Sequence, residues 1–314
     1  MEFIIVSPKQ SCGGGPLILY KLCKLLNEQG YKARIYNLIS GERSSSFIKR
    51  CISYFKECLK HYLKYDSILM KIFFRKKANK WRFESIKGVK TLKLPFYNKK
   101  NTIVIYPEII YGNPLKALNV VRWLLSYDKF NGEKYYSDDD LVFTYRTQFN
   151  DFNINPTCRK VTIQDFNKDL YKRYNYGKRS GTCFIIRKGS VRKDLPKHFD
   201  GIIVDNLSEE EKVKVFNICE KCFCYDMQTF YATIAAFCGC DVECVVEEGK
   251  TRNDYLKKED VVYGVAYGHT AKELKFAKET RSKILDVIEE RERNNIKNVK
   301  YLIEECINYF QKIM

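Results

Sequence analysis

The chain has 314 residues, of which 45% are hydrophobic, and a formal net charge of +18. This length fits one large domain or two of ordinary size, and the apolar content is typical of a packed globular protein. No run of about 18 apolar residues is present, which argues against a membrane-spanning helix. Residues 1–6 lack the basic start and small-residue cleavage site of a signal peptide, so we expect a cytoplasmic protein.

The positive charge is concentrated in one segment. Residues 43–100 hold 17 Lys and Arg against three acids, a net charge of +14. Over residues 47–64, apolar side chains recur every three or four positions with cations between them. This pattern predicts a basic amphipathic helix that binds an anionic membrane surface peripherally. An ordinary helix with its apolar side on the core and its cations in solvent explains the pattern equally well.

Thirteen cysteines raise the question of a zinc or disulfide protein. Cys219 and Cys222 have the spacing of a zinc half-site. However, Cys222 and Cys224 alternate within an apparent strand, and Cys238 lies in an apolar helical run. Free cysteine behaves as a small buried hydrophobe. We therefore expect reduced core cysteines rather than metal ligands.

Apolar runs and helix-like spacing alternate along the first half. An expected strand at 3–6, a glycine loop, an expected helix at 16–29 and an expected strand at 33–38 open a parallel α/β sheet. Past the basic segment, the sequence predicts strands at 89–94 and 102–106, a helix at 114–126, and strands at 141–145 and 160–163.

A second α/β series follows a polar stretch at 167–180, which we interpret as a linker. The expected elements are strands at 182–187 and 201–204, a helix at 208–219, a strand at 222–225, a helix at 229–238, a strand at 241–246, and helices at 270–291 and 296–312. The sequence thus predicts two α/β domains, 1–172 and 173–314, with residues 43–100 inserted in the first.

Two charged residues stand at the ends of expected strands in the second half. Asp226 directly follows the apolar run 222–225, and Arg187 closes the strand at 182–187. Open α/β sheets bind ligands at the carboxyl ends of their strands. Arg192 and Lys193 come soon after Arg187, and cations in such a place suit a diphosphate. A solvated basic turn is the alternative.

The first half offers a weaker phosphate signal. Gly13, Gly14 and Gly15 precede an expected helix, where backbone N–H groups can approach phosphate or sugar closely. The loop lacks the spacing of a dinucleotide fingerprint, and no Lys-Ser or Lys-Thr pair follows it.

These features resemble the GT-B glycosyltransferases, which use nucleotide sugars. The glycine loop with its helix is one point of similarity, and Arg187 with Arg192 resembles the basic pair that grips the donor diphosphate. In many retaining members, two glutamates eight residues apart precede a helix with a small-residue end and a glycine. Counting back from Gly239 puts Asp226 on the first acidic position and Ile234 on the second.

Further segments resemble bacterial glycosyltransferases of surface-polysaccharide (capsule and lipopolysaccharide) biosynthesis. They are 106–108, 112–115, 122–123 and 264–268. The resemblance implies two Rossmann-like domains facing each other across a cleft, a nucleotide-diphosphate sugar as donor, and a saccharide or lipid-linked glycan as acceptor. It also implies transfer without a metal or any other cofactor, since the nucleotide sugar is a substrate. Neither retention nor inversion of the sugar follows from these residues.

The resemblance also implies roles for single residues. Asp226 and Tyr225 would contact the donor sugar, and Thr229 would join the arginines and Lys193 at the diphosphate. Ile234 cannot accept a ribose hydroxyl, so the donor nucleotide would be held differently, by Thr229 or by backbone groups. A deoxyribose donor such as a dTDP-sugar would lose less from the missing acid, but the sequence leaves the donor nucleotide open. The acceptor-side candidate for a general base is Glu108, which follows the strand at 102–106. A carboxylate bonded to a helix N-terminus or an arginine is the alternative for Glu108.

Two other functions compete. The charge and the many Tyr and Phe residues fit a nucleic-acid-binding protein, but no recognised binding motif accompanies them, and we do not expect nucleic acid as a partner. A Rossmann-type oxidoreductase also fits two α/β domains. It is disfavoured because the dinucleotide spacing is missing and no acid closes the strand that ends at Leu38.

Overall fold

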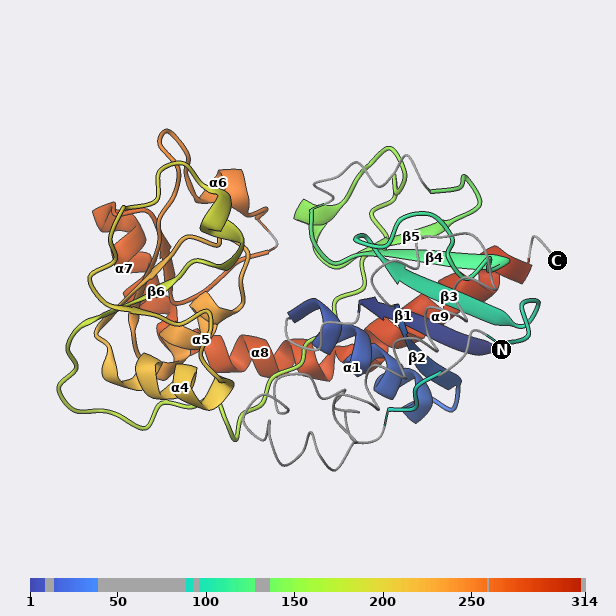
Figure 1. Cartoon of the computed structure of the whole chain (residues 1–314), viewed down its shortest axis with the longest axis horizontal. Helices are drawn as coiled ribbons and strands as arrows, with labels where there is room; N and C mark the ends of the chain where they lie inside the picture. The colour runs from blue at the N-terminus through green and yellow to red at the C-terminus, as the bar shows by residue number, and fades with distance from the viewer. Residues whose placement is uncertain (9–13, 39–88, 93–95, 128–135, 259, 312–314) are drawn as a thin grey trace, which may run out of the picture. The chain divides into compact units, whose positions relative to one another are not determined.

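The computed structural model describes residues 1–8, 14–38, 89–92, 96–127, 136–258 and 260–311 (Figure 1). The chain divides into two compact units. Unit 1 comprises Met1–Ile163 and Asn294–Met314, and unit 2 comprises Gln164–Arg293. Within the described residues, each unit contains one sheet of five parallel strands together with helices. The predicted α/β class is confirmed.

Unit 1 is built around the strand order β2-β1-β3-β4-β5. Its described elements are β1 (Glu2–Pro8), α1 (Gly14–Glu28), β2 (Lys32–Leu38), β3 (Thr102–Pro107), β4 (Asn119–Leu124), β5 (Leu141–Thr144), the short helix η4 (Thr147–Phe149) and α9 (Asn295–Gln311). The first strand lies between the second and the third, with Ile5 opposite Ile35 and Ile105.

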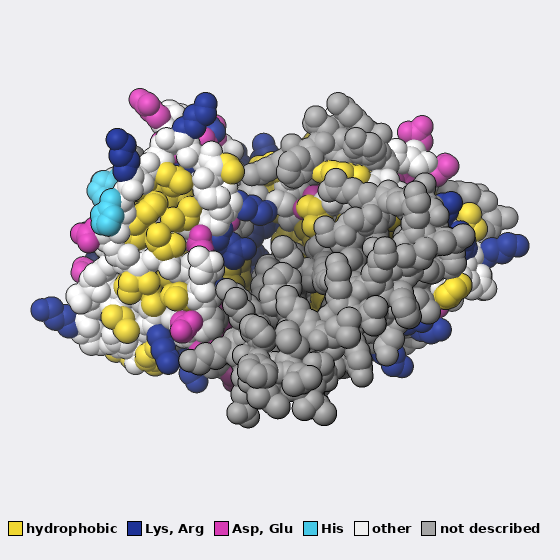
Figure 2. Space-filling model, viewed as in Figure 1, with side chains coloured by type: hydrophobic (Ala, Val, Ile, Leu, Met, Phe, Trp, Pro, Cys, Tyr) yellow, Lys and Arg dark blue, Asp and Glu magenta, His cyan; other side chains and the backbone are white. Residues whose placement is uncertain are grey.

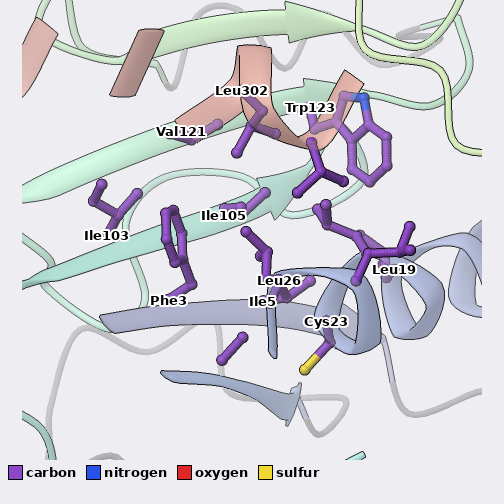
Figure 3. Packing of buried hydrophobic residues seen from close by; sticks show 14 of the residues in the cluster. Phe3, Ile5, Leu19, Cys23, Leu26, Ile103, Ile105, Val121, Trp123 and Leu302 are labelled. Atoms are coloured by element: carbon purple, nitrogen blue, oxygen red, sulfur yellow. The ribbon is translucent and has the colours of Figure 1, made fainter. Parts of the chain in front are cut away.

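One face of this sheet packs against α1 and α9 (Figure 3). Alternate strand residues point to this face, so Phe3 and Ile5 share a buried cluster with Leu26 of α1 and Leu302 of α9. Trp123 is also fully buried there and donates its indole N–H to the Val161 carbonyl at 3.1 Å. A separate cluster lies on the opposite face.

The expected helix at 114–126 is wrong, because residues 119–124 form β4. Val120–Leu124 is buried throughout, and a short continuous apolar run does not distinguish a strand from a buried helix. Arg122 interrupts the run but is itself buried, with its Nε 2.7 Å from Asp140 Oδ2. The Asp140 side chain is 5% exposed and is therefore a buried ion-pair partner of β4.

Other expectations in the first half have mixed outcomes. The expected strands at 89–94 and 160–163 are reduced to single bridges, which pair Ile35 with Thr91 and Thr144 with Lys160. Most of the basic segment 43–100, including its predicted amphipathic helix, lies outside the described residues.

Unit 2 repeats the plan of unit 1. Its elements are β6 (Thr182–Ile185), η5 (Arg187–Val191), β7 (Ile202–Ile203), α4 (Glu209–Ile218), β8 (Lys221–Cys224), α5 (Tyr231–Cys238), β9 (Asp241–Cys244), α6 (Arg252–Tyr255), β10 (Val265–Tyr267), α7 (Ala271–Thr280), η6 (Arg281–Lys283) and α8 (Ile284–Arg293). The strand order is β10-β9-β8-β6-β7, so β6 again lies between the next two strands.

The core of unit 2 is rich in thiols. Cys183, Cys222, Cys224 and Cys244 point from the strands toward the cluster that includes residues of α4, α5 and α8. These thiols are buried and free, as expected from their alternation. Burial raises the pKa of the Cys238 thiol on α5 to about 12.

The opposite face of this sheet has lighter cover. The crossover from β6 to β7 contains only η5, and the Phe199 ring packs 4.9 Å from Phe184 on that face. Ile203 of the edge strand is 41% exposed. Figure 2 shows apolar side chains gathered on the surface of unit 2, at left. Helices usually cover both faces of a parallel sheet, whereas the β6–β7 crossover supplies no α-helix to this face.

The expected domain division is wrong in two places. The boundary falls at Ile163, and the polar stretch expected to link the domains is part of unit 2. Asn217 accepts the backbone N–H groups of Tyr174 and Asn175, and Arg179 donates to the Phe216 carbonyl. These hydrogen bonds hold the polar segment on unit 2. Because the segment shows no hydrophobic periodicity, this packing was not predictable from the sequence.

The second error concerns the end of the chain. The helix α9 belongs to unit 1 rather than unit 2, because its apolar side packs on the first sheet. In the described parts of the chain, no helix is long and apolar enough to cross a membrane.

The position of α9 predicts where a core mutation will act. Leu302→Ala should lower the unfolding free energy of unit 1 by about 2–5 kcal/mol, through lost burial and a cavity. Hydrogen exchange should rise in β1 and β3 and stay nearly unchanged in β8. The control is Glu304→Ala, at an exposed position of the same helix. Equal loss of protection in β8 would contradict the assignment of α9 to unit 1.

Candidate functional site

The candidate site lies at the carboxyl ends of β6 and β8, adjacent strands at which the strand order reverses. The chain leaves β6 toward one edge of the sheet and leaves β8 toward the other, which opens a crevice where α/β sheets bind ligands. Arg187 follows β6 and Asp226 follows β8. Arg187 Nε lies 3.7 Å from Asp226 Oδ2. The structure thus brings together the two residues that the sequence indicated most strongly.

Asp226 occupies a turn between β8 and α5. Its residue is 5% exposed, and its Oδ1 accepts the Gln228 N–H at 3.2 Å. Thr229 donates its own N–H to the Asp226 carbonyl at 3.3 Å. The Thr229 hydroxyl accepts the N–H of Tyr231, the first residue of α5, at 3.3 Å. The carboxylate is therefore fixed by its own loop and reaches Arg187 through the other oxygen.

Arg187 has an unusual backbone conformation, with φ at 41°. A non-glycine residue in this region is strained and needs support from its surroundings. Asp205, which follows β7, supplies it: its carboxylate accepts the Ile186 N–H at 3.1 Å and the Arg187 N–H at 2.6 Å. Two successive N–H groups in right- and left-handed conformations form a nest for an anion. Here the chain's own carboxylate fills it.

The Arg187 guanidinium stacks on an aromatic ring. Its central carbon lies 4.9 Å from the ring centroid of Tyr231. Its Nε is buried, and in the described part of the structure it has no hydrogen-bond acceptor. The side chain remains 29% exposed. A partly exposed guanidinium beside a sheet's carboxyl edge is suited to an anionic ligand.

The Tyr231 ring is anchored at its far end by Glu209, the first residue of α4. Glu209 accepts hydrogen bonds from the Tyr231 hydroxyl at 2.7 Å, the Tyr171 hydroxyl at 2.6 Å and Lys212 Nζ at 2.7 Å. Burial raises the pKa of the Glu209 carboxyl, but these three donors outweigh it, and the pKa is lowered overall. Burial and the neighbouring carboxylate raise the pKa of Tyr231.

Gly189 lets η5 lie directly on the end of β8. A Cβ at this position would stand 2.4 Å from the Tyr225 carbonyl oxygen, a contact that real side chains do not make. The Tyr225 ring lies edge-on to Phe199, 5.8 Å away between centroids. Tyr225 thus supports the loop beside the site.

Arg192 and Lys193 are placed differently from Arg187. Arg192 donates to Asp194 at 2.9 Å and to the Val245 carbonyl at 2.5 Å, and its side chain is only 9% exposed. The Asp194 carboxylate raises the pKa of Arg192. Lys193 is exposed. Arg192 is therefore occupied within the protein, which leaves Arg187 as the better-placed cation.

The α5 helix places Ile234 in the core. Ile234 is 3% exposed, so this position does not reach solvent and is not available to a ligand. Gly239 ends α5 with φ at 111°, and Arg179 lies against it, where a Cβ would meet Nη2 at 2.4 Å. The glycine is required both for the turn and for this close approach.

The candidate groups of unit 1 lie at the equivalent edge of its sheet. Glu108 follows β3, is 5% exposed, and accepts the Leu125 N–H at 2.9 Å. The Glu108 carboxylate thus has a structural role as acceptor of a backbone N–H, whether or not it also acts as a base. Gly14 and Gly15 begin α1, and Gly13 lies outside the described residues.

Comparison of the sequence with protein-family models and with curated proteins finds no match. Among the described residues, no group of three or more His, Cys, Asp and Glu side chains is arranged to hold a metal ion.

Asp205, Glu209 and Tyr231 were not identified from the sequence. Asp205 could have been, since it ends an expected strand in the same way as Asp226. Glu209 and Tyr231 each begin a helix, and nothing in the sequence connects them.

The support that Asp205 gives to Arg187 predicts a loss of stability. Asp205→Ala should cost about 1–3 kcal/mol in unfolding free energy, because two N–H groups lose their acceptor and the strained φ loses its support. Chemical denaturation measures this change. Asn206→Ala, at the exposed neighbouring position, is the control. Equal stability of the two variants would contradict the role of Asp205.

The lowered pKa of Glu209 predicts a pH dependence. A carboxyl whose folded pKa is below its ordinary value of 4.5 stabilises the fold above that pH. The contribution is lost as the pH falls through the lowered folded pKa. The stability difference between the wild type and Glu209→Gln should therefore be largest above about pH 5 and shrink on acidification. Denaturant titrations from pH 7 to pH 3 measure it, with the exposed Glu210→Gln as control. A difference that grows on acidification would refute this assignment.

Proposed function

We propose that the chain is a glycosyltransferase that moves a sugar from a nucleotide-diphosphate donor to a saccharide or lipid-linked glycan acceptor, without a metal. One observation carries the proposal: the Arg187 guanidinium, whose Nε has no acceptor in the described part of the structure, lies 3.7 Å from a carboxylate at the point where the strand order of a parallel sheet reverses. Such a pair offers a cation to a diphosphate and a hydrogen-bond acceptor to sugar hydroxyls.

The chemistry of sugar transfer needs both groups. Negative charge grows on the leaving diphosphate while positive charge grows at the anomeric carbon. Arg187 would stabilise the leaving group with charge-assisted hydrogen bonds, whose donors are already oriented before the ligand arrives. Asp226 would accept hydroxyls of the donor sugar. The separation of 3.7 Å is an ion pair without a hydrogen bond, so each partner can take its own part of the donor.

The two sheets support the coarser part of this proposal. Each unit has parallel strands and a reversal of strand order, as expected for two Rossmann-like domains. The finer GT-B assignment rests on the resemblance in residues. In it, unit 2 takes the donor and unit 1 the acceptor. Glu108 would be the base of an inverting reaction, with its direction fixed by the Leu125 N–H.

Two variants separate the phosphate and sugar roles. Arg187→Gln should weaken binding of both a nucleoside diphosphate and its sugar conjugate by about 10- to 100-fold. Asp226→Asn should leave the diphosphate affinity nearly unchanged and remove the extra affinity that the sugar provides. Calorimetry with UDP, GDP, dTDP and their glucose conjugates measures both effects.

The exposed Lys197→Gln is the matched control for loss of a cation in the same region. Ile234 is buried and cannot accept a ribose hydroxyl. We therefore predict that UDP and GDP bind no more tightly than dTDP in the same titrations. Absence of binding to every nucleotide, or equal effects of the Arg187 and Lys197 variants, would sink the proposed function.

A further inference from the structure

The Tyr231 side chain makes cation–π contacts with two cations through its ring and one hydrogen bond through its hydroxyl. The Arg187 guanidinium lies 4.9 Å from its centroid, and Lys212 Nζ lies 4.8 Å from it. The hydroxyl donates to Glu209 at 2.7 Å. The ring thus connects the site to the first turn of α4.

The anchor of this ring is itself well fixed. Glu209 lies in the first turn of α4, which starts with a capping box between Ser208 and Glu211. Three donors converge on the Glu209 carboxylate, from Tyr231, Tyr171 and Lys212. The aromatic ring therefore cannot move away without breaking its hydrogen bond to an ionised group, which is stronger than an ordinary one.

Arg187 needs such a support. A free arginine side chain samples many rotamers, and ordering it on a ligand costs affinity. Asp205 fixes its backbone and Asp226 is 3.7 Å from its Nε, but neither holds the plane of the guanidinium. The ring face does so, by a cation–π contact that does not occupy the Nε donor.

We infer that Tyr231 is a positioning residue, which holds the Arg187 guanidinium in the orientation that receives the diphosphate of the donor. This inference rests on the proposed function. Glu209 acts one step further away, through the Tyr231 hydroxyl. The alternative is that Tyr231 serves only to pack α5 against α4.

A double-mutant cycle separates the two roles. The probe is inorganic pyrophosphate, titrated calorimetrically into the full chain without added metal. The variants are Arg187→Gln, Tyr231→Leu, Tyr231→Phe and the combination of Arg187→Gln with Tyr231→Leu. Thermal unfolding of each variant is followed by circular dichroism, so that a change in folding is seen separately.

Tyr231→Leu should weaken pyrophosphate binding about 5- to 30-fold, the effect of losing a partly desolvated cation–π contact. Tyr231→Phe keeps the ring, loses its anchor, and should weaken binding about 2- to 5-fold. In the Arg187→Gln background, Tyr231→Leu should cause no further loss, because the side chain that it positions is already gone. A packing role would lower stability by the same amount in both backgrounds.

Wild-type affinity in Tyr231→Leu, or an equal loss with and without Arg187, would overturn this inference and leave the proposed function standing. If the wild type and Arg187→Gln bind pyrophosphate equally, Arg187 does not take the diphosphate, and both proposals fail together. Tyr231→Phe keeps the test valid if the leucine variant does not fold.

Discussion

The strand order constrains everything else at the candidate site. In a parallel sheet, every strand must be reached by a crossover, and the first strand of each unit is followed by neighbours on opposite sides. Where the connections that follow two adjacent strands run toward opposite edges of the sheet, a crevice stays open between the two loops. Arg187 and Asp226 meet there because one residue ends each strand.

Charge within unit 2 is used to fix geometry. Asp205 binds two N–H groups, Glu209 gathers three donors, and Arg179 donates to carbonyls at the ends of α4 and α5. A charged side chain is costly to bury alone, but once it is paired it fixes the orientation of the groups that it binds. Arg187 differs in position, since it follows β6 at the carboxyl edge of the sheet and lies 3.7 Å from Asp226. Under the proposed function, the diphosphate of the donor would supply acceptors to the Arg187 guanidinium.

The sequence was informative where a single residue stood at the end of an apolar run. Asp226 and Arg187 were found in this way, because strand tips can be located without knowing which strands are neighbours. The sequence could not show that Tyr231 and Glu209 meet, since their contact depends on how α4 and α5 pack. It also misjudged β4, whose buried Arg122 resembles a helix surface until Asp140 is placed beside it.

The placement of α9 has a consequence for how the protein forms during synthesis. Unit 2 is one continuous stretch, residues 164–293, whereas unit 1 requires α9, which lies beyond it. The apolar face around Phe3 and Ile5 therefore stays uncovered by α9 while the 130 residues of unit 2 are synthesised. Unit 2 can close its own core first, so the order of completion reverses the usual progress from the N-terminus. A chaperone that binds apolar strands would meet unit 1 during that interval.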